Sequence, residues 1–129
     1  MRILLVLFLA IPFCLHSQSS QKVVEFTSTK KHLGMVDKGS KVSDQFVFIN
    51  NSDDDVEIDM VSTCECTSAK WTRGKIAPGK KGVISFIFDS SKKEEVEPVD
   101  IDVFFKNTNP ETGSPLVVFL SYTFKYPRQ

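Results

Sequence analysis

The sequence of 129 residues has no excess of charge of either sign, because sixteen Lys and Arg residues balance sixteen Asp and Glu residues. This balance argues against a nucleic-acid-binding protein or a polybasic membrane-surface protein, since both need a cationic face. The six Gly and six Pro residues are too few for a low-complexity chain. Hydrophobic residues at 41% and charged residues at 25% are instead typical of one soluble globular domain.

The only long hydrophobic run lies at the N-terminus, where residues 3–13 are apolar throughout. A membrane-spanning helix needs about twenty such residues, so this run is too short to cross a bilayer. Arg2 precedes the run and polar residues follow it, which is typical of a cleavable secretory signal. We expect residues 1–17 to form a signal peptide that is cleaved after Ser17. A lipoprotein signal would place a small residue before Cys14, and the bulky Phe13 disfavours that alternative.

After residue 22 the apolar residues recur with a period of two, which predicts strands with one buried and one solvated face. The segments with this pattern are 42–48, 56–60, 84–88, 99–105 and 116–124, with shorter candidates at 23–26 and 33–36. No segment has a helix cap followed by a helical stripe. The sequence therefore predicts an all-β fold, an immunoglobulin-like antiparallel β-sandwich of seven or eight strands over residues 22–127.

Cys64 and Cys66 are the residues most able to carry chemistry. Removal of the signal peptide takes Cys14 with it, and the compartment beyond the inner membrane is oxidising, so we predict a disulfide between the two. Alternate residues of a strand lie about 6.5–7 Å apart at Cα, so the chain must bend here. If the strand from Val56 continues unbroken, Met60, Ser62 and both cysteines share its inner face, with a bulge expected near Thr63.

Three roles stay open for this pair. It can be structural, as a passive disulfide or as buried apolar side chains. It can be a labile disulfide with a redox role. It can also belong to a Cu(I) or zinc site, for which His32, Met35 and Met60 are the nearest further ligands in type.

Other candidate sites are weaker. We interpret His32 as an exposed strand residue, and Asp53–Asp55 as a solvated turn that lacks the spaced oxygens of a calcium loop. Asn50 begins a glycosylation sequon, but a plain polar turn accounts for the same residues. No Ser/His/Asp set or glycine-rich phosphate loop can be assembled. The sequence thus predicts no catalytic residues, no cofactor and no metal, and a protein that is not an enzyme.

Several segments together resemble a known family. They are Leu33 to Gly39 with its two glycines, Phe46 to Asn51, Thr63-Cys64-Glu65-Cys66-Thr67, and Ile76-Ala77-Pro78-Gly79. In this order they are similar to the bacterial domain-of-unknown-function family 1573, a set of secreted immunoglobulin-like modules. Glu65 departs from the family pattern, which has Gly between the cysteines. The resemblance implies an immunoglobulin-like fold and an exported location, and it implies no activity.

These observations favour a non-catalytic exported binding or scaffold module of the bacterial envelope or extracellular space. We expect an unidentified protein partner, no nucleic acid, no membrane span, a monomeric state, and a periplasmic or extracellular location. The alternative is a thiol redox or copper-handling protein that acts through Cys64 and Cys66. A third class, strand donation at a free sheet edge, requires a long exposed edge strand, which one sequence does not reveal.

Overall fold

The structure is a computed structural model that describes residues 22–128, so the predicted signal peptide and Cys14 lie outside the described residues. Strands account for most of the described chain, together with the short 3₁₀ turn η1 (Ser90–Lys92). The strands are β1 (Val24–Phe26), β2 (Lys30–Met35), β3 (Lys41–Asn50), β4 (Ile58–Ser62), β5 (Thr67–Trp71), β6 (Lys81–Asp89), β7 (Val99–Thr108) and β8 (Pro115–Lys125).

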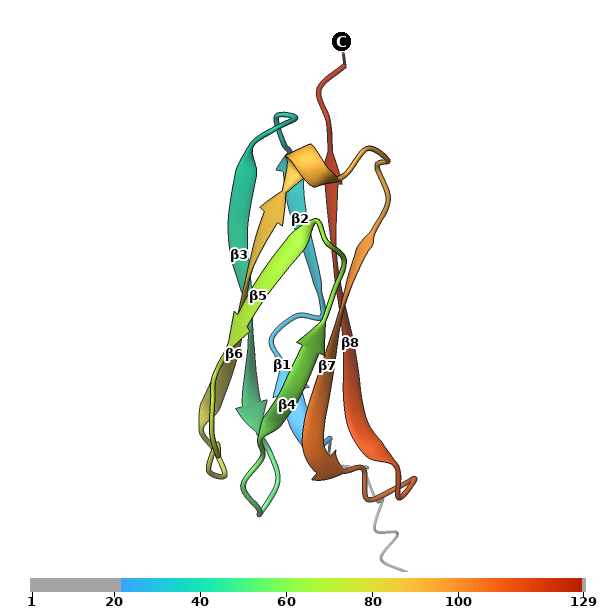
Figure 1. The fold of residues 1–129 in the computed structure, drawn as a ribbon. Helices are drawn as coiled ribbons and strands as arrows, with labels where there is room; N and C mark the ends of the chain where they lie inside the picture. Colours follow the sequence, from blue (N-terminus) through green and yellow to red (C-terminus); the bar gives the residue numbers. More distant parts are fainter. Residues whose placement is uncertain (1–21, 129) are drawn as a thin grey trace, which may run out of the picture.

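The eight strands form two four-stranded sheets that pack face to face (Figure 1). We call the sheet with the order β1-β3-β6-β5 the front sheet and the sheet with the order β2-β8-β7-β4 the back sheet. This arrangement confirms the predicted immunoglobulin-like sandwich. We call the end with the β4–β5 turn and the C-terminus the upper end, and the end with the β7–β8 hairpin the lower end (Figure 1).

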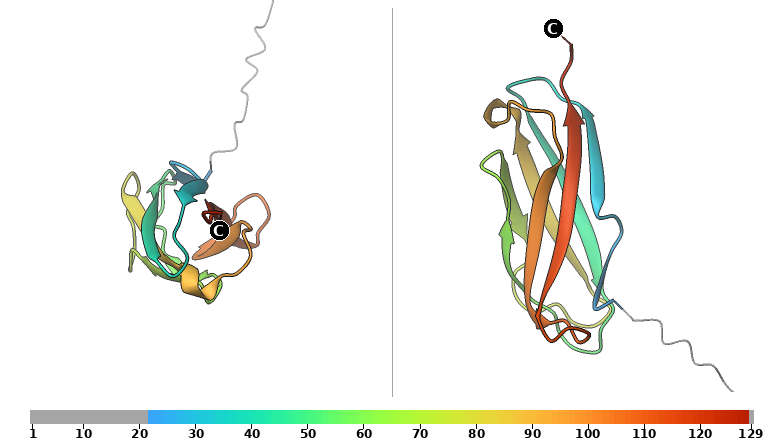
Figure 2. Two further views of the ribbon diagram at one scale, coloured as in Figure 1. Left: turned by 90° about the horizontal axis from the view of Figure 1, so that it is seen from above. Right: turned by 90° about the vertical axis from the view of Figure 1, so that its right-hand side faces the viewer.

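One strand pair departs from the predicted antiparallel arrangement. The chain leaves the front sheet after β1 and joins the back sheet as β2 without reversing direction (Figure 2). As a result β2 runs parallel to β8, with Lys30 beside Ser121 and Met35 beside Lys125. The remaining strand pairs described are antiparallel.

The core consists of the inward-facing residues of both sheets, as the period of two predicted. Phe86 of β6 stacks on Tyr122 of β8 with ring centroids 4.7 Å apart, and both side chains are fully buried. The front sheet contributes Phe46, Phe48, Ile84, Phe86 and Phe88, and the back sheet contributes Ile101, Val103, Phe105, Leu120, Tyr122 and Phe124. Six of the eleven Phe residues in the sequence thus lie in this core.

Two details of the strand prediction were wrong. The register of β4 shifts between Ile58 and Met60, so Met60 is 48% exposed and Val61 faces the core instead. This bulge lies before the expected position near Thr63, and β4 ends at Ser62. The sequence pattern also missed β5, because its inward positions include Thr67 and Ala69, which do not give an alternation of large apolar residues.

Candidate functional site

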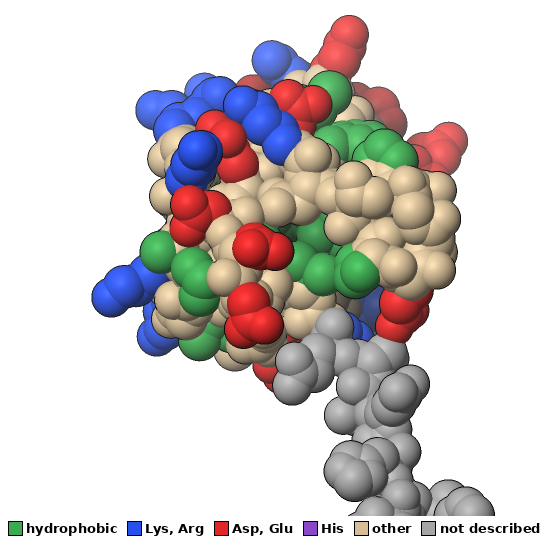
Figure 3. All heavy atoms as spheres, turned by 90° about the horizontal axis from the view of Figure 1, so that it is seen from below, with side chains coloured by type: hydrophobic (Ala, Val, Ile, Leu, Met, Phe, Trp, Pro, Cys, Tyr) green, Lys and Arg blue, Asp and Glu red, His purple; other side chains and the backbone are tan. Residues whose placement is uncertain are grey.

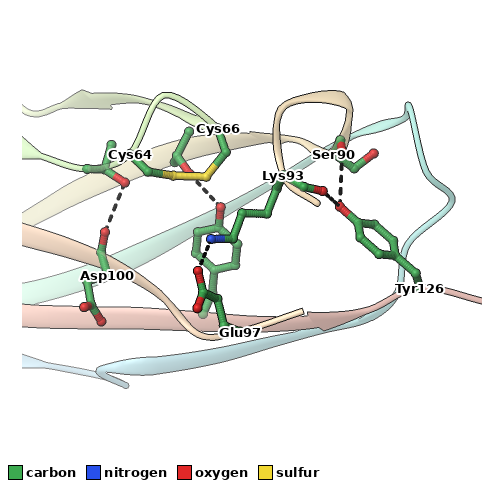
Figure 4. Close-up of a disulfide and its surroundings, with 10 residues drawn as sticks. Cys64, Cys66, Ser90, Lys93, Glu97, Asp100 and Tyr126 are labelled. Atoms are coloured by element: carbon green, nitrogen blue, oxygen red, sulfur yellow. Dashed lines mark hydrogen bonds and ion pairs between the residues drawn. A yellow bond between two sulfur atoms is a disulfide. The ribbon is translucent and has the colours of Figure 1, made fainter. Parts of the chain in front are cut away.

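The Cys64–Cys66 pair lies in a tight turn that carries the chain from β4 in the back sheet to β5 in the front sheet (Figure 4). The amide of Thr67 donates to the carbonyl of Cys64 over 3.1 Å, which closes a β-turn with Glu65 and Cys66 in its centre. The turn brings the Cα atoms of the two cysteines to 5.2 Å, within the range that a disulfide requires. The bend that the sequence analysis required is therefore present, and the two sulfurs lie at disulfide distance.

Glu65 fits this turn although the family pattern has Gly at its position. No non-Gly residue among the described residues has a positive φ, so the centre of the turn needs no left-handed conformation. A turn with both central residues at negative φ accepts most side chains. Glu65 itself is exposed, and its carboxylate can remain in solvent.

The turn is anchored to the core through Thr67. Its hydroxyl lies 2.6 Å from the hydroxyl of Tyr122, and the two cysteine sulfurs lie 3.4 and 3.5 Å from the same Thr67 oxygen. Burial raises the pKa of Tyr122 to about 12, and the hydrogen bond to Thr67 acts in the opposite direction. At neutral pH the Tyr122 hydroxyl is therefore a neutral hydrogen-bonding group.

The two sulfurs differ in exposure, which bears on their chemistry. Cys66 is 1% exposed and belongs to the core cluster, whereas Cys64 is exposed to solvent. A small pocket of about 260 Å³ adjoins Cys64 and includes Lys93, Asp100 and Asp102. A reagent in solution would reach the pair from the Cys64 side.

Lys93 is a residue that the sequence analysis missed, because it lies far from the cysteines in the chain. The connection from β6 to β7 carries it to the pocket, and the hydroxyl of Tyr126 holds this connection by donating to the carbonyl of Lys93 over 2.6 Å (Figure 4). The ammonium group of Lys93 forms an ion pair with Glu97. This pairing reduces its ability to stabilise a thiolate.

The other possible metal ligands do not gather around the cysteines. His32 is exposed on β2, where its Nδ1 atom lies 2.7 Å from the hydroxyl of Thr123. Met35 and Met60 are 63% and 48% exposed on β2 and β4. Among residues 22–128, no group of three or more His, Cys, Asp or Glu side chains could hold a metal ion.

Asn50, the first residue of the sequon, is a buried structural residue. It is 1% exposed, and its amide nitrogen donates to the carbonyls of Ile76 and Asp54 over 2.9 and 2.8 Å. Its side-chain oxygen accepts from the amide of Ser52. In the folded chain this side chain is not accessible to a glycosylating enzyme. Asp53–Asp55 is an exposed turn closed by these bonds.

A second candidate site is an apolar row on the outer face of the back sheet. Met60 lies beside Phe104, and Phe104 lies beside Val117, so the row crosses β4, β7 and β8. Phe119 extends it along β8 and is 71% exposed, the highest value among the exposed large hydrophobic residues described. The sequence showed the alternation of these strands but could not show that their outward apolar residues are neighbours.

The fold and these two sites define an immunoglobulin-like module with a cysteine turn at one end. Residues 24–116 match the sequence model of the family described as "Protein of unknown function (DUF1573)", and the chain belongs to this family. No curated protein sequence matches the chain. The family membership agrees with the resemblance seen in the sequence.

Solved structures share this fold at low sequence identity. A protein of unknown function from Porphyromonas gingivalis W83 is 17% identical, with a TM-score of 0.62 over 78% of this chain and 46% of that one. The Vibrio cholerae VesB protease is 14% identical, with a TM-score of 0.62 over 80% of this chain and 32% of that one. A PapD-like domain of human CEP192 is 13% identical, with a TM-score of 0.57 over 98% of this chain and 100% of that domain.

The chain spans less than half the length of the first two of these proteins. At these identities the similarity establishes the fold alone. No helix among the described residues is long and apolar enough to cross a membrane.

Proposed function

We propose that this protein is a non-catalytic, exported immunoglobulin-like module of the bacterial envelope or extracellular space, and that it binds another protein. The observation that carries the proposal is the apolar row of Met60, Phe104, Val117 and Phe119 on the outer face of the back sheet. Export rests on the N-terminal sequence described above.

The row is unusual because the outward face of an exposed sheet is normally polar. Its members come from adjacent strands, so their side chains form one surface and are not scattered singly. Continuous exposed apolar surface bordered by charged groups is typical of a protein-interaction site. Asp100, Asp102 and Lys106 of β7 border this row in the same sheet.

The test compares retention of envelope proteins by matched variants of the mature chain, residues 18–129. One bait is unchanged, one carries Met60→Lys with Phe119→Lys, and a control bait carries Ile87→Lys. Ile87 is 42% exposed on the outer face of the front sheet, so the control adds a lysine to a comparable site away from the row.

We expect a protein that the unchanged and Ile87→Lys baits retain and the double variant loses. Equal retention by all three baits would contradict a role for the row. An enzymatic activity of the mature chain that depends on its own side chains would contradict the proposal as a whole.

The rival proposal is a redox role through Cys64 and Cys66, favoured by the exposure of Cys64 beside the small pocket. It has less support, because Cys66 is buried and the nearby Lys93 is paired with Glu97. A reduction potential of the pair above about −300 mV, measured in glutathione redox buffers, would favour this rival, because structural disulfides typically lie below that value.

A further inference from the structure

The lower half of β8 has a partner strand on one side only. β7 pairs with β8 over most of its length, but β2 covers the other side only from Ser121 to Lys125. Below that point the chain crosses over toward β1, which pairs with β3 in the front sheet (Figure 2). No described strand therefore pairs with residues 115–120 on this side.

The backbone groups at this open edge have a defined direction. The amide of Ser121 donates to the carbonyl of Thr29 over 3.0 Å, so Ser121 turns its backbone toward the β2 side. Alternate residues of a strand direct their N–H and C=O groups to the same side. Val117 and Phe119 therefore turn their backbone groups to the open edge, whereas those of Val118 and Leu120 point to β7.

The other edge strands of the two sheets carry features that oppose the addition of a strand. β1 has only three residues. A register shift interrupts β4 at one edge of the back sheet, and another interrupts β2 at the opposite edge. β5 is short and carries the exposed Lys70. Bulges, short strands and lysines are the devices that natural sheets use to protect their edges.

The open edge lies on one side of the sandwich, between the two sheets. Charged residues protect the upper part of that side. Asp44 of β3 shares the inward face of its strand with the buried Phe46 and Phe48, and it is half-buried. Lys31 of β2 places its ammonium group 6.0 Å from the centre of the Phe46 ring. Inward-pointing charges of this kind oppose pairing with another strand. The lower half of β8 has no such residue on its inward face.

A groove of about 510 Å³ lies between this open edge and β1. Val24 and Phe26 line it from β1, and Leu116, Val118 and Phe119 line it from β8. Seen from below, hydrophobic side chains lie in a hollow at this end of the molecule, with acidic side chains around it (Figure 3). Alternate side chains of an added strand would point into such a groove.

The charges around the edge indicate the kind of strand that would fit. Glu25 and Glu111 line the groove, and Asp102 lies opposite Phe119 in the neighbouring strand. Lys22 is the one cation among the described lining residues. Charge complementarity therefore favours a strand with basic residues beside its apolar ones.

We propose that the lower half of β8 accepts an extended segment of a partner protein as an additional strand of the back sheet. The segment alternates apolar residues, which enter the groove, with residues that include Lys or Arg. Its backbone bonds to Val117 and Phe119. This inference rests on the proposed function and specifies how the partner is held.

The first test measures amide hydrogen exchange by NMR in the mature protein. In the protein without peptide we expect the amides of Val117 and Phe119 to exchange rapidly, and those of Val118 and Leu120 to be protected by their pairing with β7. A synthetic peptide of alternating Val and Thr with Lys at both ends should slow exchange at Val117 and Phe119 by about tenfold or more at saturation. The same peptide with Glu in place of Lys is the control and should bind more weakly.

The second test removes one backbone donor. Phe119→Pro deletes the amide at the open edge, whereas Phe119→Ala removes the same ring and keeps the amide. Proline is tolerated at an edge position whose N–H faces solvent. We expect the Ala variant to bind the Lys peptide and the Pro variant to lose binding, with protection of Val118 retained in both as evidence of folding.

Several results would overturn the inference. Slow exchange of Val117 and Phe119 in the free monomer would show that the edge is already covered. If these two amides become protected when the protein concentration alone is raised, a second copy of the chain covers the edge, and the partner is not a different protein. No change with the Lys peptide, or equal binding by the Pro variant, would exclude strand addition.

The two proposals fail in different ways. If the Phe119→Pro bait still retains the envelope protein that the Met60→Lys, Phe119→Lys bait loses, the outer face binds through side chains alone. In that case the proposed function stands and strand addition is wrong. If Phe119→Pro does not fold, the exchange measurements on the unchanged protein still decide the inference.

Discussion

Thr67 and Tyr122 join the two sheets of the sandwich through hydroxyl groups that lie 2.6 Å apart in the core. Thr67 is the first residue of β5 and directly follows the cysteine turn, while Tyr122 lies in the upper half of β8. Both residues are buried, at 7% and 0% exposure. The bond therefore ties the Cys64–Cys66 turn to an inner strand of the opposite sheet.

Removal of either hydroxyl should destabilise the fold, because the other then loses a partner in the core. We expect Thr67→Val and Tyr122→Phe each to lower the free energy of unfolding by about 1–3 kcal/mol. The double variant should cost less than the sum of the two, because it leaves neither hydroxyl unpaired. Urea denaturation of the four proteins gives the coupling energy. Strictly additive costs would show that the hydroxyls do not interact.

The raised pKa of Tyr122 predicts a loss of stability at alkaline pH. An unfolded tyrosine ionises near pH 10, whereas burial raises the pKa of folded Tyr122 to about 12. Between these values the unfolded chain binds fewer protons than the folded chain, so the stability contributed by the neutral phenol is lost as pH rises. Tyr122→Phe lacks this group, so the stability difference between the two proteins should shrink across this window. A constant difference would show that Tyr122 ionises normally.

The cysteine pair should be oxidised in the exported protein and should mainly fix local geometry. Alkylation under denaturing, non-reducing conditions should label no thiols in the mature chain. A loop this short constrains the unfolded chain little, so Cys64→Ser with Cys66→Ser should cost about 1–2 kcal/mol and still fold. Two labelled thiols per chain would refute the disulfide. A stoichiometric copper or zinc ion in the purified protein would support the rival function.

Phe86 and Phe119 form a matched pair for testing which side chains stabilise the core. Phe86 is 1% exposed between the sheets, whereas Phe119 is 71% exposed on the back sheet. Phe86→Ala should lower the free energy of unfolding by about 3–5 kcal/mol. Phe119→Ala should change it by no more than about 0.5 kcal/mol. Chemical denaturation measures both losses of unfolding free energy. Equal losses would show that Phe86 and Phe119 do not face the core and the solvent as described.

The N-terminus of the exported protein tests the predicted signal peptide. We expect the mature chain to begin at Gln18 and to carry no lipid, because Ser17 is small and Phe13 is bulky. Intact-mass measurement of the exported form distinguishes the two processing routes. A mature chain that begins at Cys14 with added acyl mass would show lipoprotein processing.

The period of two and the turn residues were enough to predict the sandwich. Phe46 and Phe48 in β3, and Ile84 and Phe86 in β6, face inward as the alternation indicated. Such alternation is readable because one face of each strand must leave water and the other must not. The family motifs around Cys64 and Cys66 are also short stretches of sequence, so they can be recognised without the fold. The family that they indicated is the one to which the chain belongs.

The tertiary structure decided the features that depend on neighbouring strands. A local pattern records which face a residue occupies, but it does not record which strand lies beside it. Thus only the packed sheets show that Lys93 adjoins the cysteine turn and that Met60 shares a row with Phe104. The open edge at Val117 and Phe119 is a feature of the same kind. It exists because β2 begins only beside Ser121 of β8, and that position depends on long-range strand pairing.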